Sequence, residues 1–362
     1  MLRLGAYQIL FMDRVPDSAA VDESVELVKR KKHQRASGMV NAVLRRLSRE
    51  KDVLPEIPSG DRVQYLSLRY SHPEWLVRRL VELLGEEEAE EYLRLDNEAV
   101  PTTIQRNPMR CTAAELEESL RDAGAEIKPH PWMPECWLLT GGGSLEAMPA
   151  FQQGWFQVQD AAARAAVLAS GVEPGTRVLD VCAAPGGKSF AAAMVMEDRG
   201  EIAACDIHRH KLALIEKGAE RLGLTCIHAG LADGRQCREE WLEAFDAVLC
   251  DVPCSGLGII RKKPDIRYKD PAQLAGLPRV QRAILENAGR YVKPGGILLY
   301  ATCTVLPEEN GAVTADFLSN RPEFHLEPFR LPGLEGENDG SLTLWPQRHG
   351  TDGFYICRMR RS

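Results

Sequence analysis

The stretch "TRVLDVCAAPGGKSFAAAMVMED" (residues 176–198) decides the fold of this chain. A short apolar run with branched side chains ends at a turn that contains two consecutive glycines, and an alanine-rich segment follows directly. This order is typical of a buried strand, a tight turn and the helix that covers the sheet. The sequence therefore predicts one strand–turn–helix unit of a parallel sheet here.

The same alternation continues toward the C-terminus. Apolar runs that predict strands alternate with amphipathic segments that predict helices, which indicates a parallel sheet covered on both faces. The predicted strands are 200–208, 225–230, 245–253 and 295–303, and the predicted helices are 209–224 and 273–292. Two late segments, "TLWPQ" (343–347) and "GFYICRM" (353–359), predict additional antiparallel edge strands.

The composition indicates an ordinary globular protein. The chain has 362 residues, 44% of them hydrophobic and 27% charged, with a net charge of −7. No apolar run is long enough for a membrane span, so no membrane partner is expected. The ten cysteines are scattered and none forms a CxxC pair. We therefore expect no metal site, and a location in the reducing cytoplasm.

Periodicity and linkers divide the chain into three parts. Residues 1–58 have helical periodicity and lead into a linker rich in proline and glycine at 54–61. Residues 59–145 combine helical segments with short strands and predict a small α/β module. Residues 146–362 contain the alternating pattern and predict a Rossmann-like domain. The predicted fold class is thus α/β, with a helical domain at the N-terminus.

Acidic residues follow successive predicted strands. Asp206, Asp233 and Asp251 would gather with the glycine turn at the carboxyl edge of the sheet, where ligands bind in such folds. A single Asp there usually caps a turn, but the whole set predicts a nucleoside cofactor. The glycine spacing matches neither GxGxxG nor a P-loop. The predicted cofactor residues are Cys182, Ala183, Ala184, Pro185, Gly186, Gly187, Lys188, Asp206, Asp233 and Asp251.

Two cysteines stand out because each follows or ends a predicted strand. Cys254 lies in "CDVPCSGLG" (250–258) and Cys303 in "YATCTVLPEEN" (300–310). Neighbouring strands would bring both to one pocket, and a thiol whose pKa is lowered becomes a nucleophile. The residues alone leave open which one attacks. They also leave open whether Lys188 faces Asp251 or solvent.

These motifs resemble those of RNA 5-methylcytosine methyltransferases. The segments "DVCAAPGGK", "DVPCSGLG" and "ATCTVLPEEN" look like their S-adenosylmethionine, Pro-Cys and Thr-Cys motifs. The N-terminal "LRLGAYQILFMDRVPDSAAVDESVELVKR" and "GMVNAVLRRL" resemble the NusB-like RNA-binding domain of Sun/RsmB-type 16S ribosomal RNA methyltransferases. Members of this family begin with further helices before that segment, so the resemblance implies a partial NusB-like domain here.

The resemblance implies the cofactor, the substrate and the roles of the catalytic residues. S-adenosylmethionine would be the methyl donor. The target would be cytosine 967 of 16S RNA, which the enzyme would methylate before the subunit is fully assembled. Cys303 would attack the base, Cys254 would release the product, and Asp251, with Lys188 beside it, would contact the cytosine. The basic residues expected to hold RNA phosphates are Lys29, Arg30, Lys31, Lys32, Arg35, Arg261, Lys262, Lys263 and Arg267.

Two alternatives are less favoured. A related enzyme could modify tRNA or another ribosomal RNA site, but the NusB-like segment argues against it. A non-catalytic RNA-binding or antitermination factor would need neither both cysteines nor the glycine loop.

Overall fold

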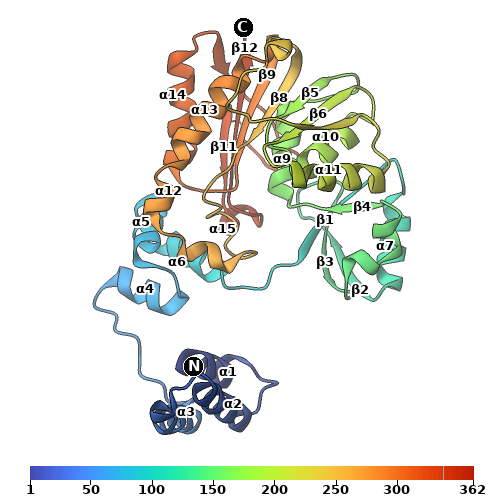
Figure 1. The fold of residues 1–362 in the computed structure, drawn as a ribbon. Helices are drawn as coiled ribbons and strands as arrows, with labels where there is room; N and C mark the ends of the chain where they lie inside the picture. The colour runs from blue at the N-terminus through green and yellow to red at the C-terminus, as the bar shows by residue number, and fades with distance from the viewer. Residues whose placement is uncertain (337) are drawn as a thin grey trace. The chain divides into compact units, whose positions relative to one another are not determined.

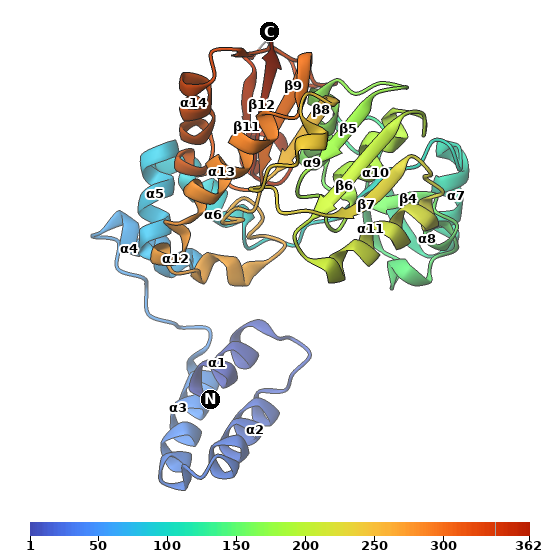
Figure 2. The same cartoon turned by 45° about the horizontal axis from the view of Figure 1, so that its top comes forward.

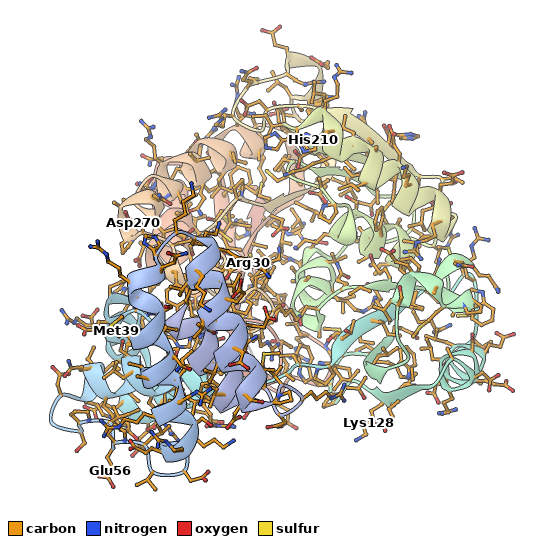
Figure 3. All side chains as sticks on the ribbon, turned by 60° about the horizontal axis from the view of Figure 1, so that its bottom comes forward. Arg30, Met39, Glu56, Lys128, His210 and Asp270 are labelled. Atoms are coloured by element: carbon orange, nitrogen blue, oxygen red, sulfur yellow. The ribbon has the colours of Figure 1, made fainter. Side chains whose placement is uncertain are left out.

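The computed structural model describes residues 1–336 and 338–362, which form two compact units, Met1–Arg69 and Tyr70–Ser362. The first unit is helical and packs around Ile9, Val21, Val40 and Leu44. Its basic residues 29–35 are exposed, and Figure 3 labels Arg30 among them. Its helices are α1 (Leu2–Phe11), α2 (Asp17–Arg30) and α3 (Ser37–Glu50), followed by α4 (Arg62–Tyr70), whose last residue begins the second unit.

The second unit opens with two helices and a small antiparallel sheet. This sheet has the strand order β2-β3-β1-β4, and β4 pairs with β1 through Ile104 and Val158. Because β4 follows the predicted boundary at 145/146, the sheet runs across that boundary. The elements are α5 (Glu74–Leu84), α6 (Glu86–Leu95), β1 (Thr102–Arg106), α7 (Ala113–Asp122), β2 (Ala125–Pro129), β3 (Cys136–Gly141), α8 (Pro149–Gln152) and β4 (Phe156–Val158).

The large sheet has eight strands in the order β10-β12-β9-β8-β5-β6-β7, with β11 also pairing with β12. Strands β5 to β9 pair in parallel, as the alternating pattern predicts. The strands are β5 (Arg177–Asp180), β6 (Glu201–Asp206), β7 (Ile227–Leu231), β8 (Phe245–Asp251), β9 (Val292–Thr302), β10 (Phe324–Leu326), β11 (Ser341–Leu344) and β12 (Phe354–Arg361).

Strand β12 is antiparallel as expected, but the prediction that it lies at an edge is wrong. It pairs with β9 on one side and with β10 and β11 on the other. Its side chains Ile356, Cys357 and Met359 are fully buried. An internal position explains why this strand reads as a nearly continuous apolar run.

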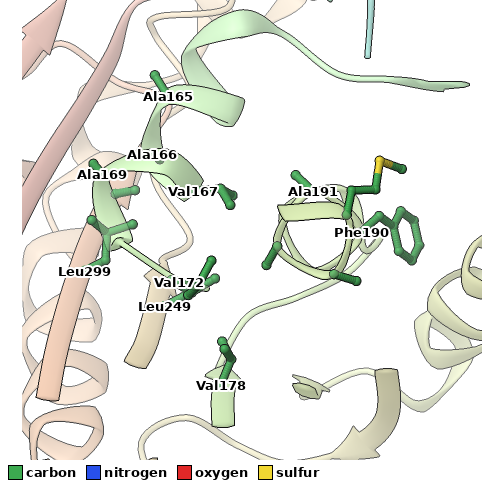
Figure 4. Close-up of a cluster of buried hydrophobic side chains, with 14 of the residues drawn as sticks. Ala165, Ala166, Val167, Ala169, Val172, Val178, Phe190, Ala191, Leu249 and Leu299 are labelled. Atoms are coloured by element: carbon green, nitrogen blue, oxygen red, sulfur yellow. The ribbon is translucent and has the colours of Figure 1, made fainter. Parts of the chain in front are cut away.

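Helices cover both faces of the large sheet (Figure 1 and Figure 2). On one face, a cluster joins α9 and α10 to the sheet, and Figure 4 shows Val167, Val178, Phe190 and Leu249 within it. On the other face, Ile284 and Phe317 belong to a second cluster. The helices are α9 (Ala161–Ser170), α10 (Gly187–Val195), α11 (Arg209–Leu222), α12 (Pro271–Leu274), α13 (Leu277–Gly289), α14 (Gly311–Asn320) and α15 (Pro346–His349).

Candidate active site

A cleft opens at the carboxyl edge of the large sheet, where the strand order reverses between β5 and β8. Ligands of doubly wound sheets bind at such reversal points. The cleft has a volume of about 510 Å³, within the range of small-molecule sites. It is lined by Val181, Cys182, Ala184, Asp206, Ile207, His208, Lys211, Ala232, Asp233, Gly234, Arg235, Asp251, Val252, Pro253, Cys254, Val280, Ile284 and Cys303.

The glycine turn shapes one wall of this cleft. Gly186 has a φ of +116°, and a Cβ there would lie 2.3 Å from the Phe190 ring, so a larger residue does not fit. Helix α10 begins at Gly187, which puts the free N–H groups of its first turn beside the turn. Of the predicted cofactor residues in this loop, Cys182 and Ala184 line the cleft, whereas Ala183 and Gly186 are buried and Pro185 is exposed.

The three predicted acids all line the same cleft. Asp206 accepts a hydrogen bond from the backbone N–H of His208 at 2.8 Å. Asp233 accepts hydrogen bonds from the Arg235 side chain, which lower the pKa of its carboxyl group. Both acids thus stabilise their own turns, the role that a single Asp usually has at this edge. Both carboxylates also line the cleft.

The two cysteine thiols meet in the lining of the cleft. Cys254 follows β8 and Cys303 follows β9, and their Sγ atoms are 3.3 Å apart. The hydrogen bond from Cys254 and the positive charge of Lys188 lower the pKa of the Cys303 thiol. The same hydrogen bond, together with burial, raises the pKa of Cys254 well above its usual value. The pair therefore favours a Cys303 thiolate that accepts a hydrogen bond from a Cys254 thiol.

Lys188 is not among the residues that line the cleft, but it faces Asp251, which is. Its Nζ donates a 2.7 Å hydrogen bond to Asp251 Oδ2 and lies 5.0 Å from the centre of the Phe354 ring. Burial alone would lower the pKa of Lys188, but the charge and hydrogen bond of Asp251 outweigh burial and raise it. The sequence left open whether Lys188 faces Asp251 or solvent, and in the structure Lys188 is a half-buried cation that pairs with Asp251.

Among the basic residues at 261–267, which the sequence predicts to bind phosphates, three instead make contacts within the protein. Arg267 is 5% exposed and donates to the backbone oxygens of Ser71 and Asp96. Arg261 and Lys262 form ion pairs with Asp160 and Asp352. The guanidinium of Arg267 therefore ties two backbone segments together, and Arg261 and Lys262 neutralise the buried Asp352 and the half-buried Asp160. Only Lys263 of this cluster keeps an exposed side chain for which the structure records no ion pair.

Sequence reasoning missed several supporting residues. Asp160 and Asp352 lie far apart in the chain, and the fold brings them together: both pair with Lys262, and the backbone N–H of Asp352 donates to Asp160 Oδ1 at 3.1 Å, so no local pattern reveals them. Asp180 does have a signal, because it is a charged residue at the end of an apolar strand. It is 1% exposed, and its Oδ2 accepts a 2.7 Å hydrogen bond from the Ser189 hydroxyl.

Asp180 should make stability depend on pH. Burial, opposed by the Ser189 hydrogen bond and aided by the charge of Asp251, raises its pKa from 3.8 to about 7. Such a group binds its proton more tightly when folded, so the free energy of unfolding falls as pH rises between these values. Asp180→Asn removes the ionisation. We therefore expect the free energy of unfolding of the variant, relative to that of the wild type, to rise by at most about 4 kcal/mol between acidic pH and a pH above neutral. Urea unfolding at acidic and at mildly alkaline pH measures the gap; a gap that does not widen with pH contradicts this assignment.

Comparison with known proteins agrees with the fold and identifies the family. Residues 167–360 match the family described as 16S rRNA methyltransferase RsmB/F, residues 1–49 the NusB family, and residues 72–146 the RsmF/B-like ferredoxin-like domain. The probable ribosomal RNA small subunit methyltransferase B of Bacillus subtilis is 38% identical, over 100% of this chain and 82% of that protein. Ribosomal RNA small subunit methyltransferase B of Vibrio cholerae is 34% identical, over 100% and 81%. The crystal structure of PH0851 superimposes with a TM-score of 0.86 at 28% identity, covering 99% of this chain and 81% of that one.

The sheet order and the cleft at its reversal point define the fold class of S-adenosylmethionine-dependent methyltransferases. The chain belongs to the RsmB/F family of 16S rRNA methyltransferases. It is thus an enzyme that uses S-adenosylmethionine and acts on ribosomal RNA. In the described part of the chain, no helix is long and apolar enough to cross a membrane, and no group of three or more potential metal ligands occurs.

Proposed function

We propose that this enzyme methylates carbon 5 of a cytosine in 16S ribosomal RNA through a covalent bond between Cys303 and carbon 6 of the base. The observation that carries the proposal is the thiol pair, 3.3 Å apart, which lines the same cleft as Asp206 and Asp233. Carbon 5 of cytosine is a poor nucleophile, and a thiolate bound at carbon 6 makes it enamine-like. A methyl transfer to a nitrogen or oxygen atom would need no such pair.

The residues divide the reaction between them. The Cys303 thiolate adds to carbon 6, and the Cys254 thiol gives up its proton to ring nitrogen 3, which balances the charge on the ring and leaves Cys254 as a thiolate. Bound S-adenosylmethionine supplies the methyl group to carbon 5. The Cys254 thiolate then takes the proton from carbon 5; the electrons of that C–H bond form the 5,6 double bond, and the Cys303–carbon 6 bond breaks to return the Cys303 thiolate. Ring nitrogen 3 gives up its added proton to solvent as the product leaves, so Cys254 ends as the thiol with which it began. Asp251, oriented by Lys188, binds the amino group and ring nitrogen 3.

The chain has groups that fit the cofactor. Asp206 would hold the ribose hydroxyls and Asp233 the adenine amino group, since both carboxylates face the cleft. The glycine turn from Cys182 to Lys188 would bring backbone N–H groups close to the ligand at the start of α10. The volume of about 510 Å³ leaves room for a nucleoside cofactor.

The exposed basic run of the N-terminal unit supports RNA binding. Its members are Lys29, Arg30, Lys31, Lys32 and Arg35, and all have exposed side chains. Contacts to phosphates supply affinity without sequence specificity. We propose that this run and Lys263 hold the RNA, and that the target is cytosine 967, reached before the subunit is fully assembled.

We expect purified enzyme to transfer labelled methyl groups from S-adenosylmethionine to unmodified 16S RNA, and nuclease digestion with mass spectrometry to identify 5-methylcytidine at one position. Assembled small subunits and unmodified tRNA serve as the comparison substrates. Methylation of tRNA alone would favour the related-enzyme alternative. Binding of the cofactor without any transfer would contradict the proposal and favour an RNA-binding factor.

A further inference from the structure

Glu309 is a buried acid next to the thiol pair that the mechanism above does not use. It ends the 3-10 helix η5 (Pro307–Glu309) and is 1% exposed. Its Oε2 accepts a 2.9 Å hydrogen bond from the backbone N–H of Ser255 and a 2.8 Å hydrogen bond from Gln281 Nε2. One oxygen of a buried carboxylate thus collects two donors beside Cys254.

Gln281 extends this contact to the other side of the same cysteine. The side chain of Gln281, on α13, is fully buried, and its Nε2 also donates to the backbone oxygen of Pro253 at 3.0 Å. The carbonyl before Cys254 and the N–H after it are therefore both tied to the Glu309–Gln281 pair. The Ser255 hydroxyl adds a 2.8 Å hydrogen bond to Thr304, which follows Cys303. This network fixes the backbone of one thiol relative to the other.

The hydrogen bonds to Ser255 and Gln281 do not by themselves explain why a charged side chain occupies this position. Burying a charge is costly unless it is fully paired, and Glu309 Oε1 has no hydrogen-bond partner in the described part of the chain. A glutamine could supply the same acceptor oxygen without the charge. The charge does act on Cys254: after the hydrogen bond to Cys303 and burial, the Cys303 and Glu309 charges also raise the pKa of the Cys254 thiol. A thiolate with a higher pKa is a stronger base.

We propose that Glu309 is a positioning residue for product release: with Gln281, it holds Cys254 at the place where its sulfur takes the carbon 5 proton. The inference rests on the proposed function, since it assigns a residue to the release step of that reaction. It predicts that loss of Glu309 impairs release more than attack, because the contacts of Glu309 are to the Cys254 loop and those of Lys188 are on the Cys303 side.

Glu309→Ala tests this inference. We expect its multiple-turnover rate to fall roughly tenfold or more, the cost of losing hydrogen bonds to a charged group. In a single turnover with 16S RNA, the covalent protein–RNA adduct should accumulate above the wild-type level, as seen by its shift in a denaturing gel. Glu308→Ala is the matched control, because the neighbouring Glu308 is exposed and its recorded ion pair among the described residues is with Arg79. It should behave as wild type.

Glu309→Gln separates the charge from the hydrogen bonds. The glutamine oxygen can still accept from Ser255 and Gln281, so the fold and adduct formation should be retained. Because the charge that raises the pKa of Cys254 is gone, the pH dependence of release should move to lower pH. A merely structural role for Glu309 would leave this profile unchanged, and an unchanged profile together with normal release in Glu309→Ala overturns the inference.

Two further outcomes distinguish this inference from the proposed function. If Cys254→Ala traps an adduct and Glu309→Ala does not, the inference fails and the proposed function stands. If neither Cys254→Ala nor the wild type ever forms an adduct, the proposed function fails first. Should Glu309→Ala not fold, as judged by circular dichroism, Gln281→Met takes its place: adduct accumulation supports the inference, and its absence overturns it.

Discussion

Cys303→Ala should abolish methyl transfer and the covalent RNA adduct, whereas Cys254→Ala should still form the adduct and fail to release it. Loss of a covalent nucleophile costs about 10⁴-fold or more in turnover. The structure gives the physical reason for the asymmetry. Cys303 has the lowered pKa, because it accepts a hydrogen bond from Cys254 and is near Lys188. Cys254 has the raised pKa and lies near Glu309.

The measurement is a gel shift of labelled 16S RNA after incubation with each variant and S-adenosylmethionine. Cys250→Ala provides a matched control, since Cys250 precedes the same loop but is buried in the apolar core. It should retain methyl transfer and show no adduct beyond the wild type. An adduct in Cys303→Ala together with none in Cys254→Ala would reverse the two roles.

The meeting of these thiols was predictable from the sequence, and their chemical difference was not. Each cysteine follows a predicted parallel strand, and β8 and β9 are neighbours, so one pocket follows from the pattern. The difference in pKa depends first on the hydrogen bond between the two thiols, and then on the charges of Lys188 and Glu309, which the fold brings near the pair. In the sequence, Lys188 is only a lysine after two glycines, and nothing local shows that it faces Asp251.

Contacts between residues far apart in the chain also explain why the sequence did not predict the position of β12 or the burial of two arginines. The apolar pattern of β12 indicates a strand, but its place beside β9 depends on register with residues far upstream in the chain. The basic run at 261–269 indicates a charged surface. In the structure, however, Arg261 pairs with the buried Asp352, and Arg267 donates hydrogen bonds to backbone oxygens. Charge density is visible in a sequence, and burial of that charge is a property of the tertiary contacts.

Lys188→Met should have the second large effect, a loss of roughly 100-fold in methyl transfer at neutral pH, the scale expected for a buried charge-assisted hydrogen bond and a shifted nucleophile together. Two contacts explain the size. Asp251 loses the 2.7 Å hydrogen bond that orients it toward the base. Cys303 loses the positive charge that helps to lower the pKa of its thiol, so less thiolate is present.

The pH dependence identifies which contact matters. Because removal of Lys188 raises the pKa of Cys303, the acidic limb of the pH–rate profile should move to higher pH, and raising the pH should recover part of the lost rate. The part that raising the pH does not recover measures the orientation of Asp251. Lys217→Met, at an exposed position on α11, is the control and should leave the profile unchanged. A Lys188→Met profile that is lower at every pH but not shifted would mean that Lys188 acts only by orienting Asp251, and that the hydrogen bond from Cys254 alone sets the reactivity of Cys303.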